Sequence, residues 1–262
     1  MANKKLDSKQ KETQHKLNIL KQINDEKKKK KSREDVNEFI EYVMIDEMGN
    51  YFKQSHIHRR WHKFIRKCWD AQKNPAILAP WGAGKSRQIA IGMTLFELGR
   101  NPNLRVKIVC NSDENAKKRV TSLKNYIEKS DRIKKVYPKL VPSYDHWTDH
   151  SFNISGRLYS EVDHSVEACG VESRIIGGRA DLLIFDDIVD NKSEQSPAYR
   201  QMTKDNLENV FMSRLEPSGR IGLIGTMWHR DDAHCFLIGK QSWKFMIQGV
   251  SDDFECIEEI IV

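Results

Sequence analysis

Residues 79–86 of the chain read APWGAGKS, and they overlap the end of a short apolar segment, PAILA at 75–79. Small residues followed by lysine and serine are typical of a loop whose backbone N–H groups surround a phosphate group. Such loops usually begin with glycine; here Ala79 takes that position, which an alanine tolerates if its φ is negative. In this pattern Lys85 would contact the phosphates and the Ser86 hydroxyl would reach Mg²⁺. The sequence therefore predicts a strand, a phosphate-binding loop and a helix whose N-terminus favours anions.

Two adjacent acidic residues, Asp186 and Asp187, follow the apolar residues LLIF at 182–185. An apolar run without alternation is typical of a strand buried on both faces. A carboxylate at the end of such a strand can hold Mg²⁺, so we expect Asp186 to bind the metal and Asp187 to polarise the attacking water as a base. A turn at the strand end would explain Asp186 alone, whereas the pair after a phosphate loop favours an ATP site. We expect Lys85 and the two carboxylates to meet at the tips of adjoining strands.

A third element is the segment RIGLIGT at 220–226, which predicts a strand that ends in Thr226. Thr226 could sense the γ-phosphate, and an ordinary strand-to-helix turn is the alternative. For Asp231 and Asp232 we favour the N-cap of the next helix. The residues expected to bind the nucleotide are Pro80, Trp81, Gly82, Ala83, Gly84, Lys85 and Ser86 in the loop, with Phe52 and Gln54 for the adenine by stacking and hydrogen bonding.

Strands and helices alternate along the rest of the chain. Helices are predicted from Asp113 as N-cap to about residue 130, and from Ser196 as N-cap, with Pro197 first, to about residue 215. This alternation predicts an α/β fold of the P-loop NTPase class (ASCE, RecA-like), with a mainly parallel central sheet flanked by helices. Residues 136–180 are expected to form a hairpin or a loop insertion. The further predicted strands are RVKIVC at 105–110 and WKFMIQ at 243–248.

The basic character of the protein is concentrated at one end. The 262 residues carry a net charge of +7, and residues 1–34 contain 12 Lys and Arg against 5 Asp and Glu, so this segment accounts for the whole surplus. We expect residues 1–34 to be a solvated flexible arm or a frayed helix, with contact to DNA as the alternative. Helical periodicity predicts a small helical piece at 35–70. The ATPase core would follow at 71–250, and residues 251–262 would begin a linker.

Other composition features narrow the class of protein. Five scattered cysteines without a C-x-x-C pair fit reduced thiols inside a cell. No apolar run approaches the 18 or so residues of a membrane span, and no signal peptide is recognisable. His58 and His62 are four residues apart and could share a helix face as zinc ligands. Since no acid or cysteine nearby completes a ligand set, we favour a solvated, partly packing helix face.

The three motifs together resemble the ATPase domain of phage large terminase subunits, the motors that pump DNA into proheads. The resemblance covers about residues 35–250 and rests on H-x-x-W-H before the loop, the loop itself, GGRADLLIFDDIV, and G-x-I-G-T-x-W-H-x-D-D. It implies an ATP- and Mg²⁺-dependent translocase of double-stranded DNA in the host cytoplasm. It also implies partners, namely a portal protein and a small terminase subunit, and assembly into a ring, pentameric in that family, with a monomer as the alternative for the isolated domain.

The same resemblance assigns roles to individual residues. Lys85, Ser86 and Asp186 would bind Mg-ATP, and Asp187 would take the catalytic carboxylate position. Thr226 would belong to the motif that couples hydrolysis to motion. The chain departs from the family where Trp81 replaces an arginine that many relatives carry, and where Asp187 is one methylene shorter than the frequent glutamate. Large terminases also carry an RNase H-like nuclease domain, for which the residues up to Val262 leave no room, so we expect no DNA cleavage by this chain.

A ring motor also needs a cation that assembly brings to the γ-phosphate of a neighbouring subunit. Our first candidate for this arginine is Arg174, followed by Arg179 and then Arg214. For any single one of them, a surface arginine or an ion-pair partner is the favoured alternative. Two other functions stay open. One is a nucleic-acid helicase or remodelling ATPase with a similar core, and the other is a weakly hydrolysing, nucleotide-dependent assembly adaptor.

Overall fold

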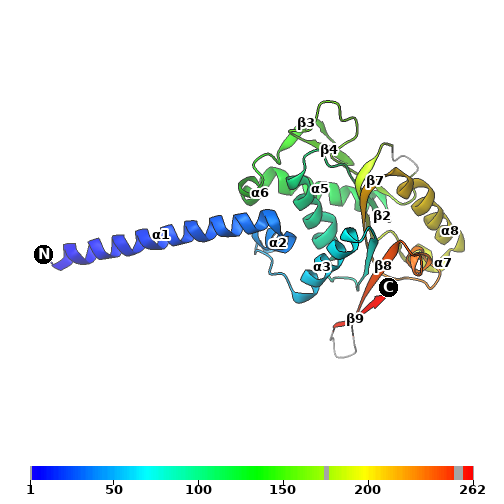
Figure 1. Ribbon diagram of the computed structural model, residues 1–262, viewed down its shortest axis with the longest axis horizontal. Helices are drawn as coiled ribbons and strands as arrows, with labels where there is room; N and C mark the ends of the chain where they lie inside the picture. Colours follow the sequence, from blue (N-terminus) through cyan, green and yellow to red (C-terminus); the bar gives the residue numbers. More distant parts are fainter. Residues whose placement is uncertain (1, 174–176, 251–255, 262) are drawn as a thin grey trace.

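The computed structural model describes residues 2–173, 177–250 and 256–261, and its centre is a twisted sheet between two layers of helices (Figure 1). Within the described residues the sheet has nine strands in the order β3-β4-β5-β2-β6-β7-β1-β8-β9. The six strands from β5 to β8 in this order are parallel to one another. The strands are β1 (Asn74–Leu78), β2 (Val106–Cys110), β3 (Pro142–Trp147), β4 (Ser151–Ile154), β5 (Val166–Gly170), β6 (Ala180–Asp186), β7 (Leu215–Gly225), β8 (Trp243–Val250) and β9 (Cys256–Ile261).

Helices cover both faces of this sheet, because the central strands alternate apolar side chains between two separate cores. In β6, Leu182 and Ile184 pack on one side, and Leu183 and Phe185 pack on the other. The first core also contains α2 (Val36–Val43), α3 (His56–Asp70), the π-helix η1 (Arg87–Met93), α4 (Thr94–Arg100), α5 (Asp113–Lys129) and α6 (Asp131–Val136). The second contains α8 (Pro197–Asp205), the π-helix η2 (Asn206–Phe211) and α9 (Ala233–Leu237), near the short helices α7 (Asn191–Gln195) and η3 (Met212–Arg214).

The predicted α/β class with a mainly parallel sheet is confirmed, and one expectation about strand order is wrong. Strand β7 lies between β1 and β6, with Leu223 paired to both Ala76 and Phe185. The phosphate loop and the acidic pair therefore follow strands that are not neighbours. Because parallel strands end at the same edge of the sheet, the three segments still meet there.

Several local predictions are confirmed and others need correction. Ser196 caps α8 with Pro197 in its first turn, and Asp232 caps α9. The N-cap of α5 is Ser112, whose hydroxyl accepts from the Asn115 N–H; Asp113 is the first helical residue instead. The insertion at 136–180 contains the expected hairpin, β3–β4, and also a strand that we did not predict, β5, which joins the parallel part of the sheet.

The basic N-terminal segment, for which we expected a flexible arm or a frayed helix, is helical. Helix α1 spans Ala2–Glu34, and Figure 1 shows it extending away from the rest of the molecule. Its C-terminal part is anchored, because the Tyr42 hydroxyl donates to Asp25 at 2.8 Å and Arg33 Nε donates to the Val136 carbonyl at 2.8 Å. None of the helices in the described residues has the length and apolar character that a bilayer span requires.

Candidate nucleotide-binding site

The loop after β1 has the backbone that a phosphate-binding loop needs. Gly82 and Gly84 both have a φ of 81°, a left-handed conformation that favours glycine. Ala79 is buried and keeps a negative φ, so the alanine causes no strain there. Its N–H donates to the Gly225 carbonyl at 3.0 Å, which ties the loop to β7. Trp81 projects into solvent with 91% of its surface exposed, and Pro80 and Ala83 are half-buried.

Lys85 lies at the point where the three segments meet. Its ammonium group donates to the carbonyl oxygens of Ala79 at 2.9 Å and Pro80 at 3.1 Å, and to Thr226 Oγ1 at 2.9 Å. Asp187 Oδ1 is 3.8 Å from Lys85 Nζ. Burial lowers the pKa of Lys85, and the negative charges of Asp187 and Asp186 oppose this shift. The arrangement holds a buried cation among oxygens that triphosphate oxygens could replace.

Ser86 and Asp186 form the second part of the site. The Ser86 hydroxyl donates to Asp186 Oδ1 at 2.8 Å. A hydroxyl and a carboxylate this close supply the oxygen ligands that Mg²⁺ takes beside phosphate groups, so these residues fit a magnesium ion. A third residue, Arg119 of α5, joins them: its Nε donates to Asp186 Oδ2 and its Nη2 donates to Ser86 Oγ at 3.0 Å. Sequence reasoning missed Arg119.

Asp187 differs from Asp186 in conformation and environment. Its φ is 51°, and its N–H donates to the Ile224 carbonyl at 2.9 Å, so the backbone turns sharply as it leaves β6. Aspartate and asparagine adopt this conformation more readily than longer residues, which gives a reason for aspartate here. Burial raises the pKa of Asp187, Lys85 opposes the shift, and Asp186 adds to it. Asp187 Oδ1 is buried without a hydrogen-bond partner in the described residues, but 35% of the side chain is exposed, so the carboxylate can meet a water molecule.

A network of buried hydrogen bonds contacts the loop and the helix that follows it. Gln54 and Gln88 exchange two amide hydrogen bonds of 2.8 Å, and Gln54 also donates to Asn37. His62 Nε2 donates to Gln88 Oε1 at 3.0 Å, and His58 Nε2 donates to the Ala83 carbonyl at 3.0 Å. Both Nε2 atoms must carry the ring proton, because their partners only accept. His58 and His62 are therefore hydrogen-bond donors to the loop and its helix. This agrees with the packing part of our expectation, but the expectation of a solvated face is wrong for His62, which is buried.

Gln54, one of the two residues proposed for the adenine, belongs to this network. Phe52 is half-buried, with the Arg87 guanidinium 5.5 Å from the centre of its ring. The Gln54 side chain is buried, and both atoms of its amide are engaged. Contact of Phe52 and Gln54 with adenine therefore stays a prediction, and for Gln54 it requires the amide pair with Gln88 to open.

Two of the candidate arginines for a neighbouring subunit, Arg179 and Arg214, are far from this site. Arg174 lies outside the described residues. Arg179 is exposed and directly precedes β6, whereas the acidic pair ends that strand. A seven-residue strand places these ends about 20 Å apart. Arg214 likewise precedes β7, at the edge of the sheet opposite Thr226. An arginine at this edge cannot reach the site of its own chain without a large rearrangement.

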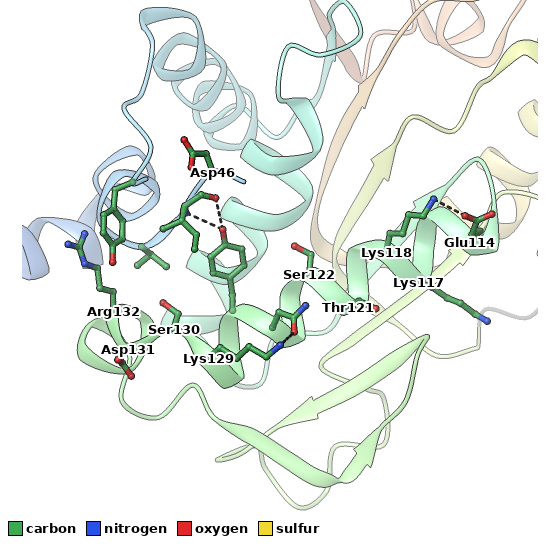
Figure 2. Close-up of a pocket in the computed structure, with 15 residues that line it drawn as sticks. Asp46, Glu114, Lys117, Lys118, Thr121, Ser122, Lys129, Ser130, Asp131 and Arg132 are labelled. Carbon is green, nitrogen blue, oxygen red and sulfur yellow. Dashed lines mark hydrogen bonds and ion pairs between the residues drawn. The ribbon is translucent and has the colours of Figure 1, made fainter. Parts of the chain in front are cut away.

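A cavity of about 810 Å³ lies beside the site, between α5 and the turn from Ile45 to Tyr51 (Figure 2). None of its lining residues belongs to the loop or to the acidic pair, so the hollow does not mark the phosphate site. The charged residues that line it have both signs, so they favour no one class of ligand. The basic ones are Lys117, Lys118, Lys129 and Arg132, and the acidic ones are Asp46, Glu114 and Asp131.

The lowered pKa values of two buried histidines predict that the protein loses stability in acid. Burial lowers the pKa of both His62 and His234 to about 4, from an ordinary value of 6.5. Between these values the unfolded chain binds protons that the folded chain does not, so the free energy of unfolding decreases as the pH falls from 6.5 towards 4. The full shift corresponds to about 3 kcal/mol for each histidine. Urea unfolding at pH 7.5 and at pH values down to about 4.5 measures this dependence.

The matched variants separate these two histidines from other titrating groups. His62→Gln combined with His234→Gln should flatten the dependence on pH, whereas His56→Gln should leave it unchanged because His56 is exposed. Equal slopes for the double variant and the wild type would show that the two buried rings do not cause the acid sensitivity.

Comparison with known proteins gives similar folds at low identity. No protein-family model matches the chain, and no curated protein is similar to it in sequence. The large terminase of bacteriophage HK97 has a TM-score of 0.49 at 18% identity, over 79% of this chain and 40% of that chain. The ATPase domain of the Thermus phage P74-26 large terminase has a TM-score of 0.41 at 16% identity, over 78% of this chain and 74% of that one. A DEAD box protein from Methanococcus jannaschii has a TM-score of 0.39 at 13% identity, over 71% and 48%.

Proposed function

We propose that this chain is an ATP-hydrolysing motor domain that moves double-stranded viral DNA into a prohead. The observation that carries the proposal is the convergence of Lys85, Ser86, the acidic pair and Thr226 at one edge of the sheet. Its first part, ATP hydrolysis, depends on these residues. Its second part, DNA packaging, depends on the motif pattern of large terminases, and the chain matches only 40% of the length of the HK97 protein.

Each residue has a defined task in the proposed hydrolysis. The loop N–H groups and Lys85 would bind the phosphates, and Ser86 and Asp186 would hold Mg²⁺, which neutralises charge on the phosphate oxygens. Asp187, with its partly exposed carboxylate and its raised pKa, would accept a hydrogen bond from the attacking water and take its proton. Thr226 contacts Lys85, so a change at the phosphates would reach the end of β7 through one side chain.

The proposal also includes an assembly. We propose a homo-oligomeric ring, five subunits in the terminase pattern, that binds a portal protein and a small terminase subunit in the host cytoplasm. The chain alone would be monomeric and slow if the arginine of a neighbour is needed.

ATP turnover in the presence and absence of DNA tests this function. We expect Mg²⁺-dependent phosphate release by the purified chain, with stimulation by linear double-stranded DNA rather than by single strands. Stimulation by single strands together with strand separation would favour the helicase alternative. Tight nucleotide binding with no turnover in the presence of DNA, portal protein and small subunit would favour the adaptor.

Mixing of variant subunits tests whether a candidate arginine acts on the site of a neighbouring subunit. Arg179→Ala and Asp187→Asn subunits are each expected to be inactive, since one lacks the cation that it gives and the other lacks the base. A random mixture in a ring would pair an intact site with an intact arginine at about a quarter of the interfaces, and turnover would return to that level. The same mixture with Arg174→Ala tests the other candidate. If neither mixture regains activity, these two arginines do not act between subunits.

A further inference from the structure

Arg119 is a cation placed on the two groups that fit the metal ion. It extends from α5, whose neighbouring residues Ala116 and Val120 are fully buried against the core. Its guanidinium donates from Nε to Asp186 Oδ2 and from Nη2 to Ser86 Oγ at 3.0 Å. The Ser86 hydroxyl donates in turn to Asp186 Oδ1 at 2.8 Å, so the three groups form a closed hydrogen-bonded unit.

This unit engages the same three oxygen atoms that a metal ion would need. Ser86 has one hydroxyl proton, which points to Asp186, and its oxygen accepts from Arg119. Each carboxylate oxygen of Asp186 already accepts one hydrogen bond. A divalent cation bound to Ser86 Oγ would lie within a few ångströms of the guanidinium, where the repulsion between the charges is strong because the site is buried. Arg119 and a metal ion therefore exclude one another from the pair of ligands.

The burial of the Asp186 carboxylate explains why the permanently charged Arg119 lies beside it. The Asp186 side chain has 0% of its surface exposed, and a charge so buried is costly without a partner. Lys85 cannot fill this role fully, since its ammonium is held by two carbonyls and Thr226. Arg119 keeps its charge at all relevant pH values: burial opposes it, but the charge of Asp186 prevails and raises the pKa of Arg119 above its ordinary value.

We propose that Arg119 takes the place of the metal ion in the nucleotide-free site, closing Ser86 and Asp186 to free divalent cations until a nucleotide arrives. The inference rests on the proposed site for Mg-nucleotide. Displacement by a free cation would leave the guanidinium without a partner in a largely buried position, at an electrostatic cost. A triphosphate supplies new oxygen partners to the released guanidinium, so exchange becomes favourable when metal and nucleotide bind together. The side chain can move by rotamer changes alone while α5 stays packed.

Binding of Mn²⁺ without nucleotide tests this inference, with electron paramagnetic resonance of the free ion as the readout. We expect wild-type protein to bind Mn²⁺ at this site weakly, and Arg119→Gln to bind it at least about tenfold more tightly, because one repelling charge is gone. The double variant Arg119→Gln/Asp186→Asn should lose the gained binding. Lys118→Gln, which removes the neighbouring charge from the exposed face of α5, should behave as the wild type.

Wild-type protein also gives a result that needs no variant to fold. Its affinity for Mn²⁺ should rise when a non-hydrolysable ATP analogue is added, after correction for metal bound by the analogue in solution. The inference would be overturned if Mn²⁺ bound equally tightly with and without the analogue and this binding were lost in Asp186→Asn. It would also be overturned if Arg119→Gln bound free Mn²⁺ no better than the wild type. Circular dichroism confirms folding, and Arg119→Lys, which keeps the charge but offers a single donor group, should lie between the two.

The outcome of the Mn²⁺ experiment can be distinguished from the outcome of the test of the proposed function. Tighter Mn²⁺ binding by Arg119→Gln in a protein that hydrolyses no ATP would support the exchange and contradict the motor. Active hydrolysis together with unchanged Mn²⁺ binding would support the motor and contradict the exchange.

Discussion

A Lys85→Met variant is expected to lose ATP turnover, with kcat at least about a hundredfold below that of the wild type, the usual cost of removing one charge-stabilising donor from an active site. Methionine keeps most of the length of the side chain but has no ammonium to place on the phosphates. The affinity for ATP should fall about ten- to hundredfold, because a hydrogen bond to a charged group is lost. Phosphate release and fluorescence titration with a labelled nucleotide measure the two effects.

Lys107→Met is a close control for this substitution. The Lys107 side chain is as buried as that of Lys85, with 4% of its surface exposed, and it pairs with Glu167 on the neighbouring strand. Its replacement removes a buried lysine and costs stability, but it should leave turnover and nucleotide affinity unchanged. Turnover by Lys85→Met equal to that of the control would remove Lys85 from the site and end the nucleotide assignment.

An Asp187→Asn variant is expected to bind Mg-ATP normally and to hydrolyse it about 10²–10⁴-fold more slowly, which is the range for the loss of a general base. Asparagine is the right substitution here, because it tolerates the φ of 51° that position 187 requires and has nearly the same shape. Glutamate would add a methylene group at a backbone conformation that it adopts less readily. Single-turnover hydrolysis and equilibrium binding, measured on the same protein, separate the chemical step from affinity.

The matched control is Asp181→Asn at the opposite end of the same strand. Asp181 has 30% of its side chain exposed, against 35% for Asp187, and it pairs with Arg105 instead of facing the loop. Its loss should reduce stability and leave hydrolysis intact. In the wild type, the raised pKa of Asp187 should move the acid limb of the kcat/KM profile to a higher pH than an ordinary aspartate gives, since the base must be ionised. Activity of Asp187→Asn similar to that of Asp181→Asn would mean that another group activates the water.

The two aspartates for which we propose different chemical roles also differ in their places in the fold. Asp186 ends β6 and is held by Ser86 and Arg119. Asp187 is turned out of the strand by its positive φ and keeps one oxygen without a hydrogen-bond partner in the described residues. A ligand for a metal needs fixed geometry, whereas a base needs access to water. The Asp186 side chain is fully buried and 35% of the Asp187 side chain is exposed, which fits these two proposed roles.

The sequence alone predicted the features that depend on neighbouring residues. The strand, loop and helix around Lys85 were recognisable because only small residues allow backbone N–H groups to converge, and Gly82 and Gly84 indeed have positive φ. The buried strand before the acidic pair was recognisable from its unbroken apolar run. Helix caps such as Ser196 followed from local hydrogen-bond chemistry.

Tertiary structure alone decided which distant side chains meet. In the folded sheet β7 lies between β1 and β6, so the side chain closest to the Lys85 ammonium group is that of Thr226 and not that of an acidic residue. Tertiary structure also placed Arg119 on Asp186 across 67 residues, a contact with no local signal because it depends on how α5 docks on the sheet. Short-range patterns reflect the conformational preferences of a few residues, whereas contacts such as these arise only when the whole hydrophobic core has chosen the positions of its strands and helices.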